Sequence, residues 1–372
     1  NKVSILIGKM SYSLYLVHWP IIVFYKYTIN RELLFIEKIW IIIFSLILAY
    51  LMYHFIESKF RYSKFRPYYP FNKFLKSGFL FVVLFLFIPA GLILIDKGWK
   101  WRVPEKYLDV NIEDTTTRDF HIKYYGGADC EKSSSCKTKE SKNFLWLLGD
   151  SHARQYAYGL KKNLKFSIQH RSQQCLFSDL DYCINIKKYY EGPDVRWKNE
   201  IFKIIKKDSN ILIISHLWSK YKNNIFNVKN SETIIFKNVL EKIEFHQNQF
   251  ILLGNYFKSR PIIIFGAVPE TRSKFSVVEC ILAPFNINNC ASTFIPKDDE
   301  YRILNRSLSK RFNHSRILFI NPFDYLCDDL FCKNLVDGKP IYSDTSHLSI
   351  WGSDYLIKKT KKKIIDYLSK FK

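Results

Sequence analysis

The sequence lacks the patterns that would explain its charge through nucleic-acid binding. Of its 372 residues, 57 are Lys or Arg and only 34 are Asp or Glu, which gives a formal net charge of +23. The basic residues are scattered along the chain, and neither a zinc-finger pattern nor an RNP motif is present. We therefore expect no nucleic-acid partner, and a solvated basic surface that faces anionic glycans or lipid headgroups.

Cysteine is absent before position 130, and the eight cysteines that follow include no CxxC pair. Structural zinc sites usually need two closely spaced pairs, so no metal site is predicted. The cysteines instead form four pairs of near neighbours, Cys130 with Cys136, Cys175 with Cys183, Cys280 with Cys290, and Cys327 with Cys332. Four local disulfides in an oxidising compartment explain this spacing, and eight unconnected buried thiols are the alternative.

Formal charge is absent from three apolar runs near the start of the chain, Met10 to Tyr25, Ile39 to Phe55 and Ser77 to Ile95. Each run is close to the ~20 residues needed to span a bilayer. Between the second and third, residues 57–76 carry six Lys or Arg against one acid. The positive-inside rule places that loop in the cytoplasm and everything after Asp96 on the other side. The chain begins with Asn1 rather than Met, which is consistent with a fragment of a longer protein.

One stretch, residues 143–155 (NFLWLLGDSHARQ), organises the remainder of the chain. Five apolar residues are followed by Gly149, Asp150, Ser151 and His152, and then by good helix formers. A buried strand, a glycine turn and a helix start present a side chain at the carboxyl ends of an open α/β sheet. The first free N–H groups of the helix favour a developing negative charge there. The simpler alternative is that Asp150 or Ser151 is only an N-cap.

A second motif near the end of the chain supplies the partners that a serine nucleophile needs. Residues 342–349 read YSDTSHLS and place Asp344 three residues before His347. A serine hydroxyl requires a base, and the base requires an orienting acceptor. We therefore predict Ser151 as the nucleophile, His347 as the base and Asp344 as the residue that orients His347. His152 is the nearest alternative base, but a neighbour in sequence points away from the serine side chain.

The two motifs together resemble the SGNH (GDSL-like) hydrolase family. Residues 149–151 (GDS) match its first block, and Asp344-x-x-His347 matches its last, over a region from about Asn143 to the C-terminus. The resemblance implies an α/β fold, a three-layer, flavodoxin-like domain with a parallel sheet. The residue patterns agree with it, because they predict strands at 144–148, 166–170, 210–216, 261–268 and 317–320 and helices at 199–207, 231–246, 301–312 and 350–371.

The chain departs from the family in its second and third blocks, where a glycine and an asparagine normally donate to the oxyanion. After the strand ending at His216 come Leu217, Trp218 and Ser219, and after the Phe265 strand comes Gly266 to Glu270. The Ser151 backbone N–H is thus the one identified donor, and losing one donor typically costs about 10²–10³ in rate. Asp150 and Trp218 are further oxyanion or substrate candidates. Asp150 also suits a helix-start acceptor, and Trp218 suits either a sugar-stacking platform or a core position.

The first sixty residues resemble a late part of the acyltransferase family 3 membrane proteins. The resemblance is carried by Ser11 to Pro20 (SYSLYLVHWP) and by His54 to Arg61 (HFIESKFR). The early helices of that family, which carry its acyl-donor histidine, are absent, so His18 receives no such role and is expected to pack among helices. Bacterial members often carry an added transmembrane helix and a periplasmic SGNH domain, and they O-acetylate lipopolysaccharide or other surface glycans.

These resemblances imply a domain order and a function. Residues 1–96 would form a membrane region of about three transmembrane helices, 97–142 a periplasmic extension and 143–372 the SGNH-like domain, in a bacterial inner membrane. The implied function is O-acyl transfer, most simply O-acetyl transfer, to lipopolysaccharide O-antigen or another surface polysaccharide through a serine acyl-enzyme. No bound cofactor is expected, because acetyl-CoA would serve the missing membrane portion, present as a separate or truncated upstream segment. The alternatives are a membrane-anchored carbohydrate esterase and a non-catalytic glycan-binding module.

Overall fold

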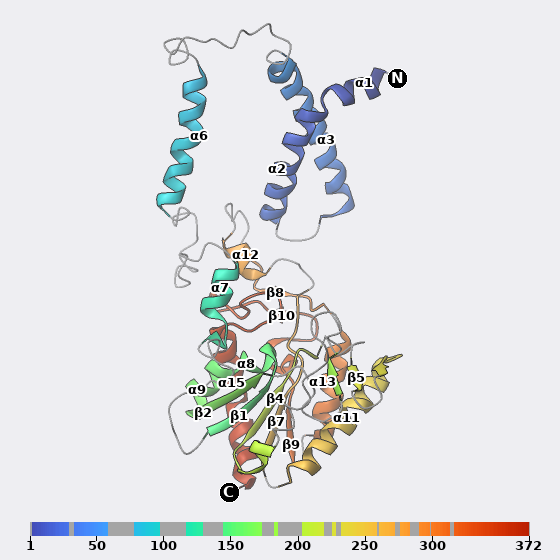
Figure 1. Ribbon diagram of the computed structural model, residues 1–372, viewed down its shortest axis with the longest axis vertical. Helices are drawn as coiled ribbons and strands as arrows, with labels where there is room; N and C mark the ends of the chain where they lie inside the picture. Colours follow the sequence, from blue (N-terminus) through green and yellow to red (C-terminus); the bar gives the residue numbers. More distant parts are fainter. Residues whose placement is uncertain are drawn as a thin grey trace. The chain divides into compact units, whose positions relative to one another are not determined.

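The computed structural model describes most of the chain, and its described residues form two compact units (Figure 1). It describes residues 2–29, 33–58, 78–96, 117–128, 144–172, 182–184, 203–218, 225–227, 232–258, 260–271, 276–282, 290–297, 299–312 and 316–371. The first unit comprises 1–115 with 279–290, and the second comprises 116–278 with 291–372. The second unit holds both predicted catalytic motifs.

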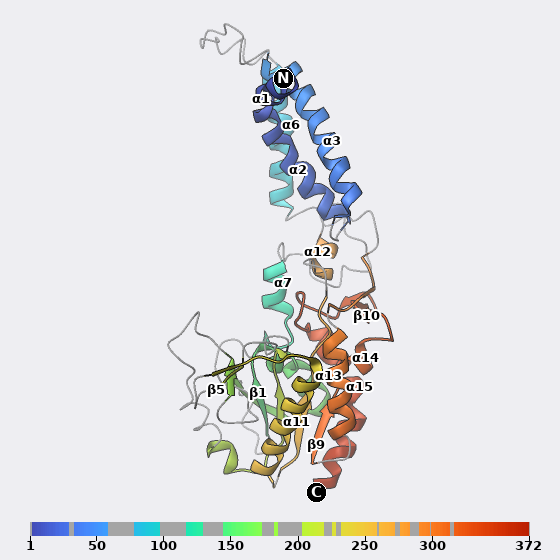
Figure 2. The same cartoon turned by 90° about the vertical axis from the view of Figure 1, so that its right-hand side faces the viewer.

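Helices make up the described part of the first unit before residue 97. They are α1 (Lys2–Lys9), α2 (Ser11–Ile29), α3 (Phe35–Met52), the π-helical turn η1 (Tyr53–Glu57) and α6 (Gly78–Ile95). The α2 and α3 helices lie side by side (Figures 1 and 2). Ser13 Oγ donates to Glu57 Oε2 over 2.6 Å, so the buried carboxylate of η1 has a hydrogen-bond partner on α2.

One described helix, Phe35–Glu57, is long and apolar enough to cross a membrane, and only 17% of its apolar window is buried. A second apolar stretch, Val83–Ile95, is shorter. The ring of His18 lies with Nδ1 3.0 Å from the carbonyl oxygen of Leu14 and 2.9 Å from that of Tyr15, so it contacts its own helix. The basic loop lies almost wholly outside the described residues, and the predicted topology stays a prediction.

The second unit contains a five-stranded parallel sheet in the order β2-β1-β4-β7-β9. Its strands are β1 (Phe144–Gly149), β2 (Ser167–Ser172), β4 (Leu212–Ser215), β7 (Ile262–Phe265) and β9 (Ile317–Ile320). Counted within this sheet the order is 2-1-3-4-5, the flavodoxin-like order of doubly wound sheets. The predicted fold class is confirmed.

Both faces of this sheet are buried, which explains why its strands are continuous apolar runs. Along β1, Leu145 and Leu147 face one core, whereas Trp146 and Leu148 face the other. The first core lies beneath α9 (Ala157–Leu164) and α15 (Ile350–Leu368), and the second beneath α11 (Val239–Tyr256) and α13 (Asp299–Phe312) (Figure 1).

Shorter elements complete the described secondary structure. The helices are α7 (Thr117–Tyr124), α8 (Ser151–Arg154), α12 (Val277–Leu282), α14 (Phe323–Leu326) and the 3₁₀ turn η6 (Ser369–Phe371). In the small sheets, β5 (Ile225–Asn227) pairs with β3 (Tyr182–Ile184) on one side and β6 (Glu232–Ile234) on the other, β8 (Thr293–Phe294) pairs with β10 (Cys332–Lys333), and β11 (Leu335–Val336) pairs with β12 (Lys339–Pro340).

One sequence prediction needs correction. The helix expected at 231–246 starts later, because Glu232–Ile234 form β6 and Asn238 Oδ1 caps α11 by accepting from the N–H groups of Leu240 and Glu241. The domain boundary expected at Asn143 stays a prediction. The second compact unit begins at Thr116 and includes α7, which lies in the segment predicted as an extension.

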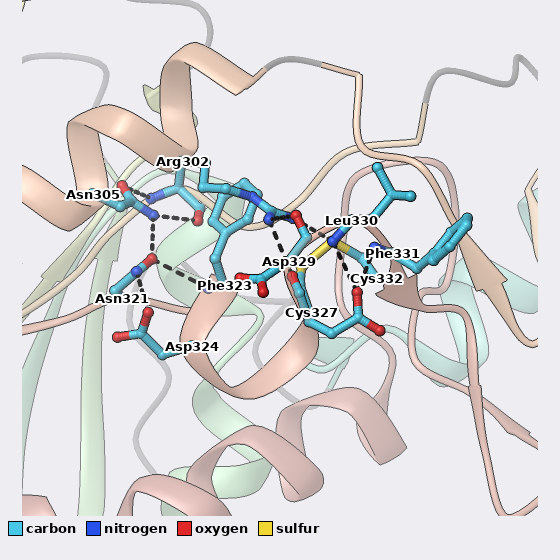
Figure 3. Close-up of a disulfide and its surroundings, with 12 residues drawn as sticks. Arg302, Asn305, Asn321, Phe323, Asp324, Cys327, Asp329, Leu330, Phe331 and Cys332 are labelled. Atoms are coloured by element: carbon cyan, nitrogen blue, oxygen red, sulfur yellow. Dashed lines mark hydrogen bonds between the residues drawn. A yellow bond between two sulfur atoms is a disulfide. The ribbon is translucent and has the colours of Figure 1, made fainter.

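Two of the four predicted disulfides are present, Cys280–Cys290 and Cys327–Cys332. The second closes a short loop after α14, and Figure 3 shows Arg302 of α13 reaching that loop. Its Nη1 donates to the carbonyl oxygen of Asp328 over 3.0 Å and to that of Asp329. In the other predicted pairs, Cys130, Cys136 and Cys175 lie outside the described residues, so these pairings stay predictions.

Candidate active site

The site begins at the glycine turn after β1. Gly149 has a φ of +139°, a conformation that L side chains rarely adopt. A Cβ at this position would also overlap the carbonyl oxygen of Ser215 on the neighbouring strand β4. The turn therefore requires glycine, and it lies between β1 and β4, where the strand order of the sheet reverses. That switch point is where open α/β sheets bind ligands.

Asp150 connects the turns after β1 and β4. Its Oδ1 accepts from the N–H of His152 over 2.8 Å, and its Oδ2 accepts from the N–H of Leu217 over 2.8 Å. As the N-cap of α8, this carboxylate has the helix-start role that its position in the sequence suggests. An acceptor cannot donate to an oxyanion, so the geometry does not support Asp150 as an oxyanion-stabilising group.

The structure brings together the three side chains predicted to form a triad. Ser151, the first residue of α8, places Oγ 2.8 Å from His347 Nε2, although the two residues are 196 positions apart in the chain. His347 Nδ1 lies 2.7 Å from Asp344 Oδ2. Asp344 Oδ1 accepts from the backbone N–H groups of Ser346 and His347, which fixes the carboxylate within its own turn. These distances suit proton transfer between the serine and the imidazole.

The electrostatics of Asp344 set the tautomer of His347. Burial alone would raise the pKa of the Asp344 carboxyl, but hydrogen bonds from the His347 ring and from two backbone N–H groups hold this pKa well below its ordinary value. The group is therefore an ionised acceptor, so Nδ1 of His347 carries the proton that it donates. Nε2 is then free to accept the proton of the Ser151 hydroxyl.

His152 lies beside this relay without replacing the base. Its ring centroid is 4.5 Å from that of His347, and its side chain is buried. The Ser151 hydroxyl makes its hydrogen bond with His347. The distinction drawn from the sequence between the two histidines therefore agrees with the geometry.

The oxyanion donors are fewer than the family pattern would supply. The N–H of Ser151, at the start of α8, has no acceptor among the described residues. After β4, the N–H of Leu217 is occupied by Asp150, and after β7 the N–H of Ala267 is occupied by Asn305 Oδ1. These two N–H groups therefore already have acceptors within the fold.

Trp218 lies in the core, which corrects its interpretation as a sugar-stacking platform. Only 3% of the residue is exposed, and its Nε1 donates to the carbonyl oxygen of Phe265 over 3.0 Å. Its ring meets His246 and Phe250 of α11 edge to face. A ring with both faces covered cannot stack on a sugar.

Gln155 and Tyr125, which were not predicted from the sequence, connect the turn that carries Ser151 to the rest of the site. Gln155 is fully buried, its Nε2 donates to the carbonyl oxygen of His152, and its Oε1 accepts from the N–H of Leu348 over 2.8 Å. The Tyr125 hydroxyl donates to the carbonyl oxygen of Ser151. Burial raises the pKa of Tyr125 well above its ordinary value, so this hydroxyl stays a donor. Gln155 lies in the first motif, but nothing in the polar segment around Tyr125 indicates its contact.

A third histidine, His121 of α7, also reaches the site. Its Nδ1 lies 2.9 Å from Ser343 Oγ and 3.4 Å from Asp344 Oδ2. Each of His121, Asp344 and His347 offers one potential metal-ligand atom, and these atoms lie within 4.8 Å of one another. Because Asp344 Oδ2 and His347 Nδ1 already form the hydrogen bond of the relay, a metal ion there would have to displace it.

A partly buried Asp–His–Ser relay at the switch point of a parallel sheet is the arrangement that activates serine nucleophiles in α/β proteins. The model of a family described as "SGNH domain (fused to AT3 domains)" matches residues 117–362. The chain belongs to this family. The match begins at α7 and so includes the segment that carries His121 and Tyr125.

Three solved structures are similar in part. The periplasmic domain of a lipopolysaccharide acetyltransferase from Salmonella ser. Paratyphi A is 18% identical, over 61% of this chain and 85% of its own, with a TM-score of 0.43. A putative platelet activating factor from Streptococcus pneumonia is 15% identical, over 74% and 98%, with a TM-score of 0.33. A putative GDSL-like lipase from Bacteroides ovatus is 12% identical, over 62% and 55%, with a TM-score of 0.34. No curated protein matches.

Proposed function

We propose that this protein is an O-acyltransferase, most simply an O-acetyltransferase, that modifies lipopolysaccharide O-antigen or another cell-surface polysaccharide. The observation that carries the proposal is the continuous relay from Asp344 through His347 to the Ser151 hydroxyl. Membership of a family of SGNH domains fused to AT3 domains supports acyl transfer as the type of reaction. In this proposal the SGNH domain is periplasmic, and an apolar helix such as Phe35–Glu57 anchors it in the inner membrane.

The relay accounts for both halves of a transfer reaction. His347 Nε2 takes the proton of Ser151 as Oγ attacks the acyl carbonyl of the donor, and the resulting oxyanion faces the Ser151 N–H at the start of α8. His347 then gives its proton to the leaving group, and an acyl-serine remains. A sugar hydroxyl next loses its proton to His347 and attacks the acyl carbon. The sugar ester leaves, and the proton returns to Ser151 Oγ.

The relay of Asp344, His347 and Ser151 does not determine where the acyl group comes from or which acceptor receives it. The donor, which we take to be acetyl-CoA on the cytoplasmic side, would be used by an upstream membrane portion of the acyltransferase family 3 kind. A membrane-anchored carbohydrate esterase is the second candidate, because water can replace the sugar hydroxyl in the same steps. The relay itself argues against a purely glycan-binding module, which needs no ionised Asp344 to orient a histidine base for a serine.

The test follows labelled acetyl groups in membranes that contain this protein together with upstream acyltransferase helices. Transfer predicts label on the polysaccharide and a trapped acetyl group on the Ser151 peptide, and both should disappear in Ser151→Ala. Released acetate without labelled polysaccharide would identify the esterase instead. Absence of any adduct on Ser151 with a fluorophosphonate probe would refute serine chemistry altogether.

A further inference from the structure

The α7 helix brings a second imidazole to the carboxylate that orients the base. His121 Nδ1 lies 3.4 Å from Asp344 Oδ2, the same oxygen that accepts from His347 Nδ1 at 2.7 Å. The centroids of the two imidazole rings are 5.3 Å apart. Two imidazoles on different elements therefore converge on one carboxylate oxygen.

His121 also holds the residue before Asp344. Its Nδ1 is 2.9 Å from Ser343 Oγ, and Ser343 in turn donates to the carbonyl oxygen of His347 from its backbone N–H and from its Oγ. With Nδ1 protonated, the ring donates to both Ser343 Oγ and Asp344 Oδ2, and Ser343 Oγ–H is left to donate to the carbonyl oxygen of His347. This single arrangement satisfies all of these contacts.

The chain at the end of the His121 helix is fixed against residues 348–349, which follow the loop that carries Asp344 and His347. Tyr125 and Ser349 form an isolated antiparallel bridge, and the N–H of Gly126 donates to the carbonyl oxygen of Leu348 over 3.0 Å. The His121 ring lies 4.9 Å from that of Tyr125, which in turn meets the His347 ring edge to face. The position of His121 is thus set by backbone and ring contacts on the C-terminal side of α7.

We propose that His121 is a positioning residue for the triad, an inference that rests on the proposed function. The Asp344 side chain is 29% exposed and projects from a turn, so water competes for its oxygens. Nδ1 of His121 occupies the open side of Oδ2 and holds Ser343, which keeps Oδ2 aligned with His347 Nδ1. His121 acts through Asp344 and does not touch Ser151.

The experiment measures how fast Ser151 of the full chain in detergent is acylated by 4-nitrophenyl acetate and labelled by a fluorophosphonate. Both reagents bypass the glycan acceptor and the acyl donor. His121→Asn places an amide nitrogen where Nδ1 lies, whereas His121→Gln moves that nitrogen toward the position of Nε2. We expect Asn to keep most of the acylation rate and Gln to lose about tenfold, since a hydrogen bond to a charged group contributes at least that much.

This pair of variants separates positioning from mere helix stability. Gln is the better helix former, so a structural role for His121 predicts that Gln is tolerated better than Asn. The control is Arg118→Asn, an exposed position one turn earlier on α7, which should leave the rate unchanged. In the Asp344→Ala background the difference between Asn and Gln should vanish, because residues that act as a unit are not additive.

The outcomes are distinguishable. Equal rates for Asn and Gln, a better rate for Gln, or a difference that persists without Asp344 would overturn the positioning role while leaving the proposed function intact. An unlabelled Ser151 in the unmutated protein would refute the proposed function, and the positioning role with it. Thermal unfolding of each variant shows whether a lost rate reflects a lost fold.

Discussion

At the scale of single residues, Ser151 depends on neighbours supplied from elsewhere in the chain. Its hydroxyl is hydrogen-bonded to His347, and the backbone of its own helix turn is held by the Tyr125 hydroxyl and by Gln155, which accepts from Leu348. Reactivity at Ser151 is thus a property of the assembled unit, because the hydroxyl alone is a weak nucleophile.

The first prediction concerns the relay. Ser151→Ala and His347→Ala should each reduce acyl transfer by at least about 10³-fold, and the double variant should be little worse, because the residues act as one unit. His152→Ala should be much milder, since that ring makes no hydrogen bond with Ser151 Oγ. Acetylation of polysaccharide in membranes provides the measurement. A severe loss in His152→Ala with an active His347→Ala would reverse the assignment.

A second prediction concerns pH and the buried His246. Burial, with the nearby Lys242 ammonium, lowers the pKa of His246 to about 3. The unfolded chain binds this proton near pH 6.5, so the stabilising contribution is complete above pH 6.5 and declines as the pH falls from 6.5 toward 3. The slope is about 1.4 kcal/mol per pH unit for this one group.

His246→Phe should therefore reduce the pH dependence of stability between pH 6.5 and pH 4. Denaturant unfolding at a series of pH values measures it, and Asn248→Ala, an exposed and non-titrating change in the same helix α11, should leave the slope unaltered. Parallel curves for the unmutated protein and His246→Phe would show that His246 is protonated in the fold.

At the scale of elements, the turn between β1 and α8 is the least replaceable. Gly149→Ala should destabilise the domain by at least about 3 kcal/mol, because Ala must adopt the positive φ and its Cβ overlaps the Ser215 carbonyl oxygen. Gly254→Ala in α11 is the matched control. There a Cβ meets its nearest neighbour, Ile317 Cδ1, at 3.4 Å, and Ala should stabilise the helix by up to about 1 kcal/mol. Chemical denaturation measures the free energy of unfolding of both variants. Similar changes for Gly149→Ala and Gly254→Ala would contradict the prediction.

The elements also show what the sequence could and could not reveal. The strands β1, β4, β7 and β9 were predictable, because a strand covered on both faces must be an unbroken apolar run. Ile234 and Ile235 fit a helical period equally well, and the β6 pairing that decides between the alternatives is not local. The Asn238 cap was a usable local signal for the true start of α11.

The residues of the candidate site also fall into those that the sequence predicts and those that it does not. Ser151, Asp344 and His347 were predictable, because motif spacing reports the chemistry of a loop directly. His121 and Tyr125 were not, since they lie on a short polar helix whose contacts with residues 343–349 depend on tertiary packing. Burial of Trp218 had no local signal either, because a tryptophan after a strand fits a core or a surface equally.

At the scale of the whole molecule, a fourth prediction concerns the pairing of thiols. Replacing Cys327 and Cys332 by Ala should lower the free energy of unfolding by about 2 kcal/mol, the value expected from chain entropy for so short a loop. Peptide mapping without reduction should recover the Cys280–Cys290 and Cys327–Cys332 links, and we expect Cys130–Cys136 and Cys175–Cys183 beside them. Free thiols at all eight positions, or bound zinc, would refute the pattern.

Membrane topology is the remaining prediction at this scale. The six basic residues between 59 and 76 should keep that loop in the cytoplasm, while the domain after residue 96 lies on the opposite side. Single cysteines introduced at Lys64 and at the exposed Lys161 of α9, in a variant whose native thiols are blocked, can be labelled with an impermeant maleimide on intact spheroplasts. Position 161 should react and position 64 should not. Labelling at position 64 would contradict the predicted topology.

The distance along the chain between Ser151 and His347 has a consequence for biosynthesis. The ribosome makes the nucleophile and the strands β4, β7 and β9 before it adds the loop that carries the base. That loop docks through Leu348 on Gln155, and the helix after it packs on α9, where Ser353 Oγ accepts from the N–H of Gly159. On the proposed function, a nascent chain therefore displays an inert serine, and Ser151 becomes reactive only after the loop that carries His347 has been made and has docked.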